Sequence, residues 1–185
     1  MMSTITPVEP THRLWQVTDF LPPEQAADIL AVDWLNMPWH RGYMQEHWHR
    51  RAIDLDHPII QRLNSYVHDQ IPRLNQQFGT NYVRGFGLWW LDEPGFTVDI
   101  HTDGHLNNSL QLSWIAPDDS YGTRFYSDKA GKQLIYQALG RANTGYIMLN
   151  HLNEDGSQPL HWHGMPKPVP ENTFRLCNYW QFEED

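Results

Sequence analysis

The second half of the chain, from Tyr82 onward, consists of short segments rich in aromatic and β-branched residues, each bounded by turn residues. Such spacing is typical of the strands of a sandwich or barrel. We expect strands over residues 82–91, 96–101, 109–115, 123–127, 144–150, 159–163 and 173–182. A helical pattern over 132–139 interrupts this series, and we expect a helix there.

The first half is expected to supply helices. Apolar residues recur at spacings of three and four between His57 and Phe78, and Gly79 follows where helices commonly end. We therefore predict a helix over 57–78 that Pro72 kinks or ends early. The other expectations are a strand over 12–18, a helix over 23–32 and a loop with one or two short strands over 34–56.

Helices followed by many short strands predict an α+β domain that is mainly β. The antiparallel strands are expected to form a sandwich or jelly roll, with the N-terminal helices packed on the outside. A chain of 185 residues is long enough to bury one sizeable core, so we expect a single domain over residues 1–185.

Composition argues against several classes of protein. No stretch approaches the roughly 20 apolar residues of a membrane span, and the first residues lack the basic and apolar regions of a secretory signal. Cys177 is the only cysteine, so an intramolecular disulfide is impossible and a cytoplasmic location is expected. A net charge of −9 repels phosphate backbones, so neither nucleic acid nor a membrane is an expected partner.

A His-x-Asp pair ends one of the expected strands. His101 and Asp103 are two residues apart, so in an extended segment an imidazole and a carboxylate point the same way. Two histidines and one carboxylate on one face suit ferrous iron, because they leave positions open for a chelating co-substrate and dioxygen. Taken alone, the pair is equally compatible with an exposed turn.

A third ligand has two candidates, His161 and His163, on a later expected strand. Arg175 follows His163 by twelve residues, on the last strand, where Phe174, Leu176, Asn178 and Trp180 alternate with Arg175, Cys177, Tyr179 and Gln181. A buried arginine needs a partner, and its planar fork matches the remote carboxylate of a dicarboxylate. A structural ion pair is the alternative.

The order of these motifs resembles that of the 2-oxoglutarate/Fe(II) oxygenase superfamily, in particular its compact prolyl-4-hydroxylase-like members. The matching stretches are Asp19-Phe20-Leu21-Pro22-Pro23-Glu24, Pro94-Gly95, His101-Thr102-Asp103, Leu110 to Phe125 with its Gly122-Thr123 turn, His163-Gly164-Met165-Pro166 and Arg175. The resemblance implies a double-stranded β-helix and iron ligation by His101, Asp103 and His163. It also implies 2-oxoglutarate anchoring by Arg175, with Tyr179, Asn108 and Trp90 as further candidate contacts.

The implied activity is a dioxygenase that uses Fe(II), 2-oxoglutarate and dioxygen, and releases succinate and carbon dioxide. Its expected substrate is a prolyl or peptidyl group or a small amino-acid-like molecule. Asp92 stands where many relatives have a tyrosine, and Cys177 where some have a hydroxyl. Gln181 stands where nucleic-acid demethylases of the superfamily carry a second arginine, which argues against that branch.

Two alternatives stay open at this point. A cupin-like metal enzyme without 2-oxoglutarate would use both His161 and His163 as ligands and would give Arg175 no role. A non-catalytic binding domain would keep the fold alone.

Overall fold

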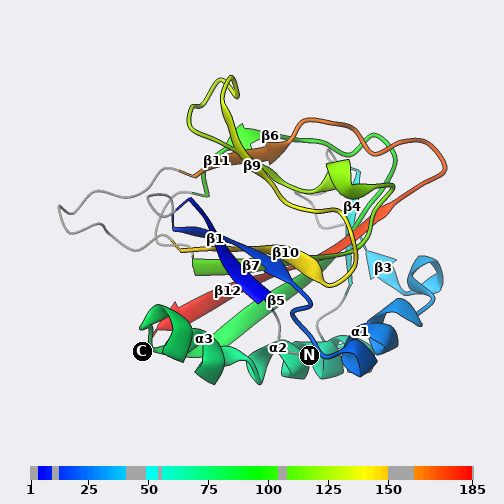
Figure 1. Cartoon of the computed structure of the whole chain (residues 1–185). Coiled ribbons are helices and arrows are strands. Elements are labelled where there is room, and N and C mark those ends of the chain that lie inside the picture. Colours follow the sequence, from blue (N-terminus) through cyan, green and yellow to red (C-terminus); the bar gives the residue numbers. More distant parts are fainter. Residues whose placement is uncertain are drawn as a thin grey trace.

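The computed structural model describes residues 4–9, 13–40, 49–53, 56–103, 108–149 and 161–184. Three layers are visible in Figure 1: the helices lie below a larger sheet, and a smaller sheet lies above it. Every described strand pair is antiparallel. The expected mainly β architecture, with helices packed on the outside, is therefore confirmed.

Twelve strands are found in the described ranges. The larger sheet contains β1 (Thr4–Glu9), β2 (Leu14–Thr18), β3 (Trp39–His40), β4 (Arg50–Ile53), β5 (Tyr82–Asp92), β7 (Asn108–Ile115), β10 (Thr144–Met148) and β12 (Arg175–Glu184). The smaller sheet contains β6 (Val98–His101), β8 (Arg124–Tyr126), β9 (Leu134–Gln137) and β11 (Trp162–Met165). Their orders are β1-β2-β10-β7-β12-β5-β4-β3 and β6-β11-β8-β9.

The helices are α1 (Pro23–Leu30), α2 (Pro58–His68) and α3 (Ile71–Phe78), with short 3-10 turns at Trp34–Asn36 and Asp119–Tyr121. The expected helix over 57–78 is thus two helices. Pro72 is the second residue of α3, where its missing N–H breaks no helical hydrogen bond. Gly79 ends α3 in the left-handed conformation, with φ at 66°. None of the described helices is long and apolar enough to cross a membrane.

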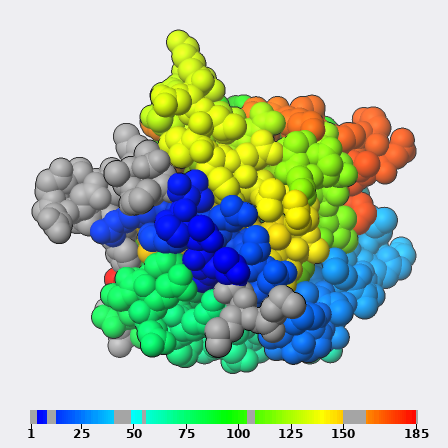
Figure 2. Space-filling model, viewed as in Figure 1, coloured from blue at the N-terminus to red at the C-terminus, as the bar shows by residue number. Residues whose placement is uncertain are grey.

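The helix expected over 132–139 is wrong, because this segment is the second strand of a hairpin. Asp128 accepts backbone hydrogen bonds from Ala130 and Gln133 at 2.9 and 3.1 Å, and this turns the chain back. β9 then pairs with β8, with Gln137 opposite Arg124. The hairpin projects from the surface at the top of Figure 2. Strand pairing outweighed the local helical pattern.

The other boundaries agree with the expectations to within a few residues, although residues 12, 150, 159 and 160 lie outside the described ranges. The loop expected over 34–56 contains two short strands, β3 and β4, as predicted. The N-terminal strand β1, which pairs with β2, was not anticipated.

The main core lies between the helices and the larger sheet. Alternate residues of the central strands, such as Leu112 on β7 and Trp180 on β12, are buried there with Leu63 of α2. Trp89 stacks between Trp34 and Trp114, with ring centroids 5.2 and 6.0 Å apart. Because strand residues alternate between faces, the intervening side chains point toward the smaller sheet.

Asn143 ties the start of β10 to the segment before α1. Its side chain donates a hydrogen bond to the carbonyl of Leu21 and accepts one from the Leu21 N–H, both at 2.9 Å, and its φ is 58°. Asn143→Ala should therefore lower the free energy of unfolding by about 2–4 kcal/mol, from two lost buried hydrogen bonds and a strained backbone. Chemical denaturation measures this change.

Asn172→Ala is the matched control. Asn172 also has a positive φ, of 60°, but it is exposed. We expect it to cost about 1–2 kcal/mol, from backbone strain alone. Equal losses at the two positions would contradict a role for the Asn143 hydrogen bonds.

Candidate active site

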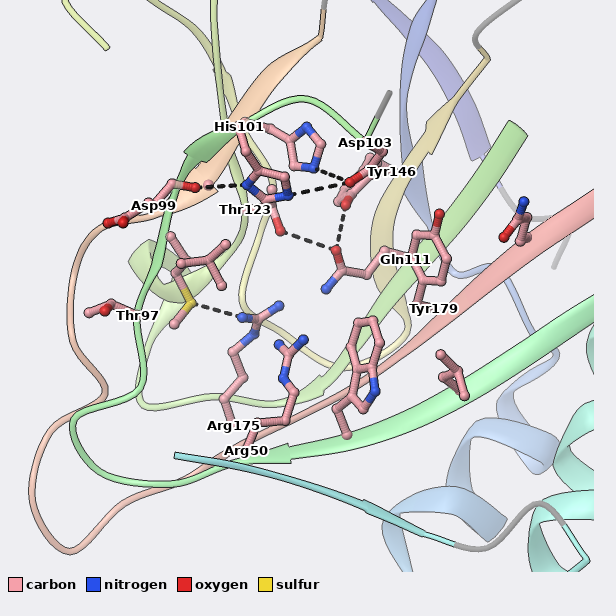
Figure 3. A pocket seen from close by; sticks show the side chains of 17 residues that line it. Arg50, Thr97, Asp99, His101, Asp103, Gln111, Thr123, Tyr146, Arg175 and Tyr179 are labelled. Carbon is pink, nitrogen blue, oxygen red and sulfur yellow. Dashed lines mark hydrogen bonds and ion pairs between the residues drawn. The ribbon is translucent and has the colours of Figure 1, made fainter. Parts of the chain in front are cut away.

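Three side chains meet where β6 and β11 pair. His163 lies directly opposite His101 in this antiparallel pair, and Asp103 follows two residues after the end of β6. Asp103 Oδ1 lies 3.3 Å from His101 Nε2 and 3.4 Å from His163 Nε2. Within the described ranges, these three residues form a group whose ligand atoms all lie within 4.8 Å of one another. The structure thus brings together the three predicted metal ligands, two of which, His101 and Asp103, are labelled in Figure 3.

The orientation of both imidazoles is set by main-chain carbonyls. His101 Nδ1 lies 2.7 Å from the Asp99 carbonyl oxygen, and His163 Nδ1 lies 2.8 Å from that of His161. With Nδ1–H donating to these carbonyls, each Nε2 lone pair is directed at the centre of the cluster. Two nitrogens and one carboxylate on one side form the donor set that ferrous iron prefers in oxygenases.

The Asp103 carboxylate is held in its charged form. Burial raises the pKa of Asp103, but hydrogen bonds with His101 and His163 outweigh burial, and the pKa lies well below its ordinary value. The same contact with Asp103 raises the pKa of His101. Three acceptor atoms that converge so closely need a shared cation or protons to offset their repulsion, and a divalent metal fits this requirement.

Gly164 allows β6 and β11 to approach each other at the cluster. A Cβ at this position would lie 2.8 Å from the Val98 carbonyl oxygen and 2.9 Å from that of Asp99. The register between the two strands shifts here, between His163 and Met165. Because the Asp99 carbonyl also orients His101, the absence of a side chain at Gly164 contributes directly to the ligand geometry.

A cavity of about 820 Å³ lies between the two sheets, and both the His101–Asp103–His163 cluster and Arg175 line it. Arg175 is the first residue of β12 and is only 3% exposed. Its Nη1 lies 3.1 Å from Asp92 Oδ2 and donates to Met165 Sδ at 2.8 Å. Arg175 Nε has no hydrogen-bond partner in the described part of the chain. The predicted arginine therefore shares one cavity with the predicted metal ligands.

The other predicted residues have different positions. Tyr179 and Trp90 line the cavity and stack with ring centroids 5.7 Å apart. Asn108 lies opposite Phe182 near the far end of β12, and the described lining of the cavity does not include it. His161 is buried outside the three-residue cluster and contributes the carbonyl that orients His163.

A polar network on the cavity wall was not anticipated. Gln111 Oε1 accepts hydrogen bonds from Thr123 Oγ1 at 3.1 Å and from the Tyr146 hydroxyl at 2.5 Å. In Figure 3, Gln111 lies between the His101–Asp103 pair and Arg175. The sequence of β7 does indicate this position of Gln111. It lies between Leu110 and Leu112, so its side chain must face the opposite side of the sheet from theirs.

Arg50 is a further lining residue that sequence reasoning missed. It stands beside Arg51 and His49 in the sequence, a short basic cluster typical of a surface loop. In the structure it begins β4 and is only 8% exposed. Only the pairing of β4 with β5 brings it into the cavity.

Gly164→Ala should disturb both stability and metal binding. We expect the free energy of unfolding to fall by about 1–3 kcal/mol from overpacking. Displacement of the Asp99 carbonyl should weaken Fe(II) binding by about 10–100-fold, as is usual when an outer-shell partner is lost. Anaerobic metal titration and chemical denaturation measure the two effects.

Gly79→Ala is the control for that variant. Gly79 has a positive φ of 66° but nothing within 4 Å of its Cβ position, and it ends a helix on the opposite side of the larger sheet. It should lose about 1 kcal/mol of stability and keep its metal affinity. Unchanged metal affinity in Gly164→Ala would contradict the role given to that glycine.

Cys177 should be unreactive in the native protein. It is fully buried, and burial raises the pKa of its thiol more than the nearby Arg175 lowers it. At pH 8 the thiol is then protonated and inaccessible, so labelling by a thiol reagent should be at least roughly tenfold slower than in guanidinium chloride. Rapid stoichiometric labelling of the folded protein would contradict this.

No protein-family model and no curated protein sequence matches the chain. Solved structures do match. A prolyl-4-hydroxylase from Pseudomonas putida superposes with a TM-score of 0.64 and 18% identity, over 95% of this chain and 94% of that chain.

Two further matches come from other sources. HygX from Streptomyces hygroscopicus, solved with nickel, 2-oxoglutarate and hygromycin B, gives a TM-score of 0.65 at 9% identity, over 94% of this chain and 84% of that chain. A viral collagen prolyl hydroxylase from Paramecium Bursaria Chlorella virus-1, in complex with 2-oxoglutarate, gives 0.58 at 11% identity, over 94% and 97%. The chain therefore has the double-stranded β-helix fold of the 2-oxoglutarate/Fe(II) oxygenases.

Proposed function

We propose that this protein is an Fe(II)- and 2-oxoglutarate-dependent dioxygenase that hydroxylates a C–H bond. The observation that carries the proposal is the position of two predicted groups in one cavity: the His101–Asp103–His163 cluster and the buried Arg175. The shared fold with structures solved with nickel or 2-oxoglutarate supports it. Bound iron, with 2-oxoglutarate and dioxygen, would supply the oxidation and yield succinate, carbon dioxide and a hydroxylated product.

In this proposal, the side chains of the protein bind and orient the metal and the co-substrate. His101, Asp103 and His163 would hold the metal, which would supply the redox chemistry. Arg175 binds the distal carboxylate of 2-oxoglutarate, for which a guanidinium is the matched partner. The Gln111–Thr123–Tyr146 network keeps the wall between them fixed. The cavity that holds these groups lies between the two packed sheets.

The proposed substrate is a prolyl or peptidyl group or a small amino-acid-like molecule. Two of the similar structures are prolyl hydroxylases, and HygX was solved with a small molecule, hygromycin B. A cavity of about 820 Å³ lies within the usual range for small-ligand sites, about 300–1,000 Å³. Trp90 and Tyr179 offer aromatic contact area on its wall.

Substitution of the metal ligands tests this function. His101→Ala and Asp103→Ala should each abolish substrate-independent turnover of 2-oxoglutarate to succinate, because the metal loses one of three protein ligands. They should also abolish the visible charge-transfer band that forms when Fe(II) and 2-oxoglutarate are added anaerobically. Retention of either signal would mean that the ligand assignment is wrong.

His161→Ala is the matched control, because its carbonyl remains to orient His163. It should keep the charge-transfer band. Loss of metal binding in this variant, together with 2-oxoglutarate-independent activity of the wild type, would favour the cupin-like alternative. Absence of the band in the wild type would favour a binding domain without this chemistry.

A further inference from the structure

Three side chains from three neighbouring strands form a row, and the two outer ones, Arg50 and Arg175, line the cavity. β5 lies between β4 and β12, and Asp92 on β5 is paired in register with Arg50 on one side and Arg175 on the other. Arg50 Nε donates to Asp92 Oδ1 at 2.5 Å, and Arg50 Nη2 donates to Oδ2 at 3.1 Å. Arg175 Nη1 approaches Oδ2 at the same 3.1 Å.

The charges in this row do not balance. Two guanidiniums share one carboxylate, so one positive charge is left over among residues that are all nearly buried, with Asp92 at 0% exposure. Buried charge without a counter-charge is costly, and Arg stays protonated in proteins. Within the described part of the chain, no second acid forms an ion pair with either arginine. One bound carboxylate would complete the neutralisation.

The hydrogen-bond donors of the two arginines also indicate a carboxylate ligand. Arg50 uses Nε and Nη2 on Asp92, while Arg175 has an unsatisfied Nε and a thioether as its second partner. A thioether is a weak acceptor, so strong donor capacity remains on both side chains. Both side chains line the cavity, and Figure 3 draws their guanidinium groups side by side below the metal cluster.

The Arg50 guanidinium is also fixed in place. It lies 4.0 Å from the Trp90 ring centroid and 4.2 Å from that of Phe96. Cation–π contacts of this kind hold a guanidinium at a defined position, and they do not neutralise its positive charge. A group that served only to neutralise Asp92 would duplicate Arg175, which already pairs with that carboxylate.

We propose that Arg50 is a second residue that binds the distal carboxylate of the co-substrate, and that Asp92 positions both arginines for it. This inference rests on the proposed function. Two arginines at this position make the site selective for 2-oxo acids with a second carboxylate, because a monocarboxylic analogue offers them no group to bind.

The test compares two ligands on the Fe(II)-loaded protein under anaerobic conditions. 2-Oxoglutarate carries the distal carboxylate, and pyruvate lacks it. Comparison of their dissociation constants, measured by calorimetry, therefore separates binding by the two arginines from binding at the metal. In Arg50→Met, the dissociation constant for 2-oxoglutarate should rise by roughly 10–100-fold, as expected for a lost charge-assisted hydrogen bond. The dissociation constant for pyruvate should stay within about threefold of the wild-type value, since pyruvate has no carboxylate that reaches the substituted residue.

Arg51→Met is the control. Arg51 is the next residue on β4, faces away from the cavity and pairs with Glu93. It should bind both ligands as the wild type does. Arg50→Lys keeps the charge without the planar fork, so its affinity for 2-oxoglutarate should lie between those of the wild type and Arg50→Met. This milder variant decides the matter if Arg50→Met does not fold.

Wild-type affinity for 2-oxoglutarate in either Arg50 variant would overturn the inference and leave Arg50 as a structural partner of Asp92. Equal weakening of both ligands would overturn it too, because that pattern indicates a disturbed metal end. Failure of the proposed function has a different signature: the wild type itself would then show no metal-dependent binding of 2-oxoglutarate.

Discussion

The register between β5, β12 and β7 is the constraint on which the rest of the structure depends. Because side chains alternate, this register sends Trp89, Leu112 and Trp180 toward the helices and Asp92, Gln111 and Arg175 toward the smaller sheet. A shift by one residue would exchange the two sets and bury charged groups in the main core. One face of these strands thus packs in the main core, and the opposite face carries the residues of the candidate active site.

Polar contacts between buried side chains add to apolar packing on the cavity face. Two small apolar clusters lie between the sheets, one around Phe125 and one around Phe96, and they flank the polar space. Asp92 pairs with two arginines, and Gln111 accepts hydrogen bonds from two hydroxyls. Shared acceptors of this kind fix the orientation of the donors that reach them.

Much of this arrangement could be predicted from local pattern. The alternation on β12 correctly separated Arg175 from Leu176 and Trp180. The His-x-Asp pair and the resemblance to the oxygenase superfamily selected His101, Asp103 and His163, the three residues that cluster. Local pattern was wrong at 132–139, where a turn stabilised by Asp128 and pairing with β8 outweighed helical spacing. Arg50 gave no usable signal, because its burial depends on a neighbour 42 positions away, Asp92. Long-range pairing of this kind leaves no local periodicity.

The imidazoles of the cluster take their orientation from the main chain. The carbonyl oxygens of residues 99 and 161 accept the Nδ1–H groups of His101 and His163, and any amino acid at those positions supplies the same acceptor. The geometry of the cluster is therefore insulated from side-chain exchange at its nearest neighbours. Sequence drift at these two positions would leave the tautomer and aim of both rings intact, whereas a change in strand pairing, as at Gly164, would not.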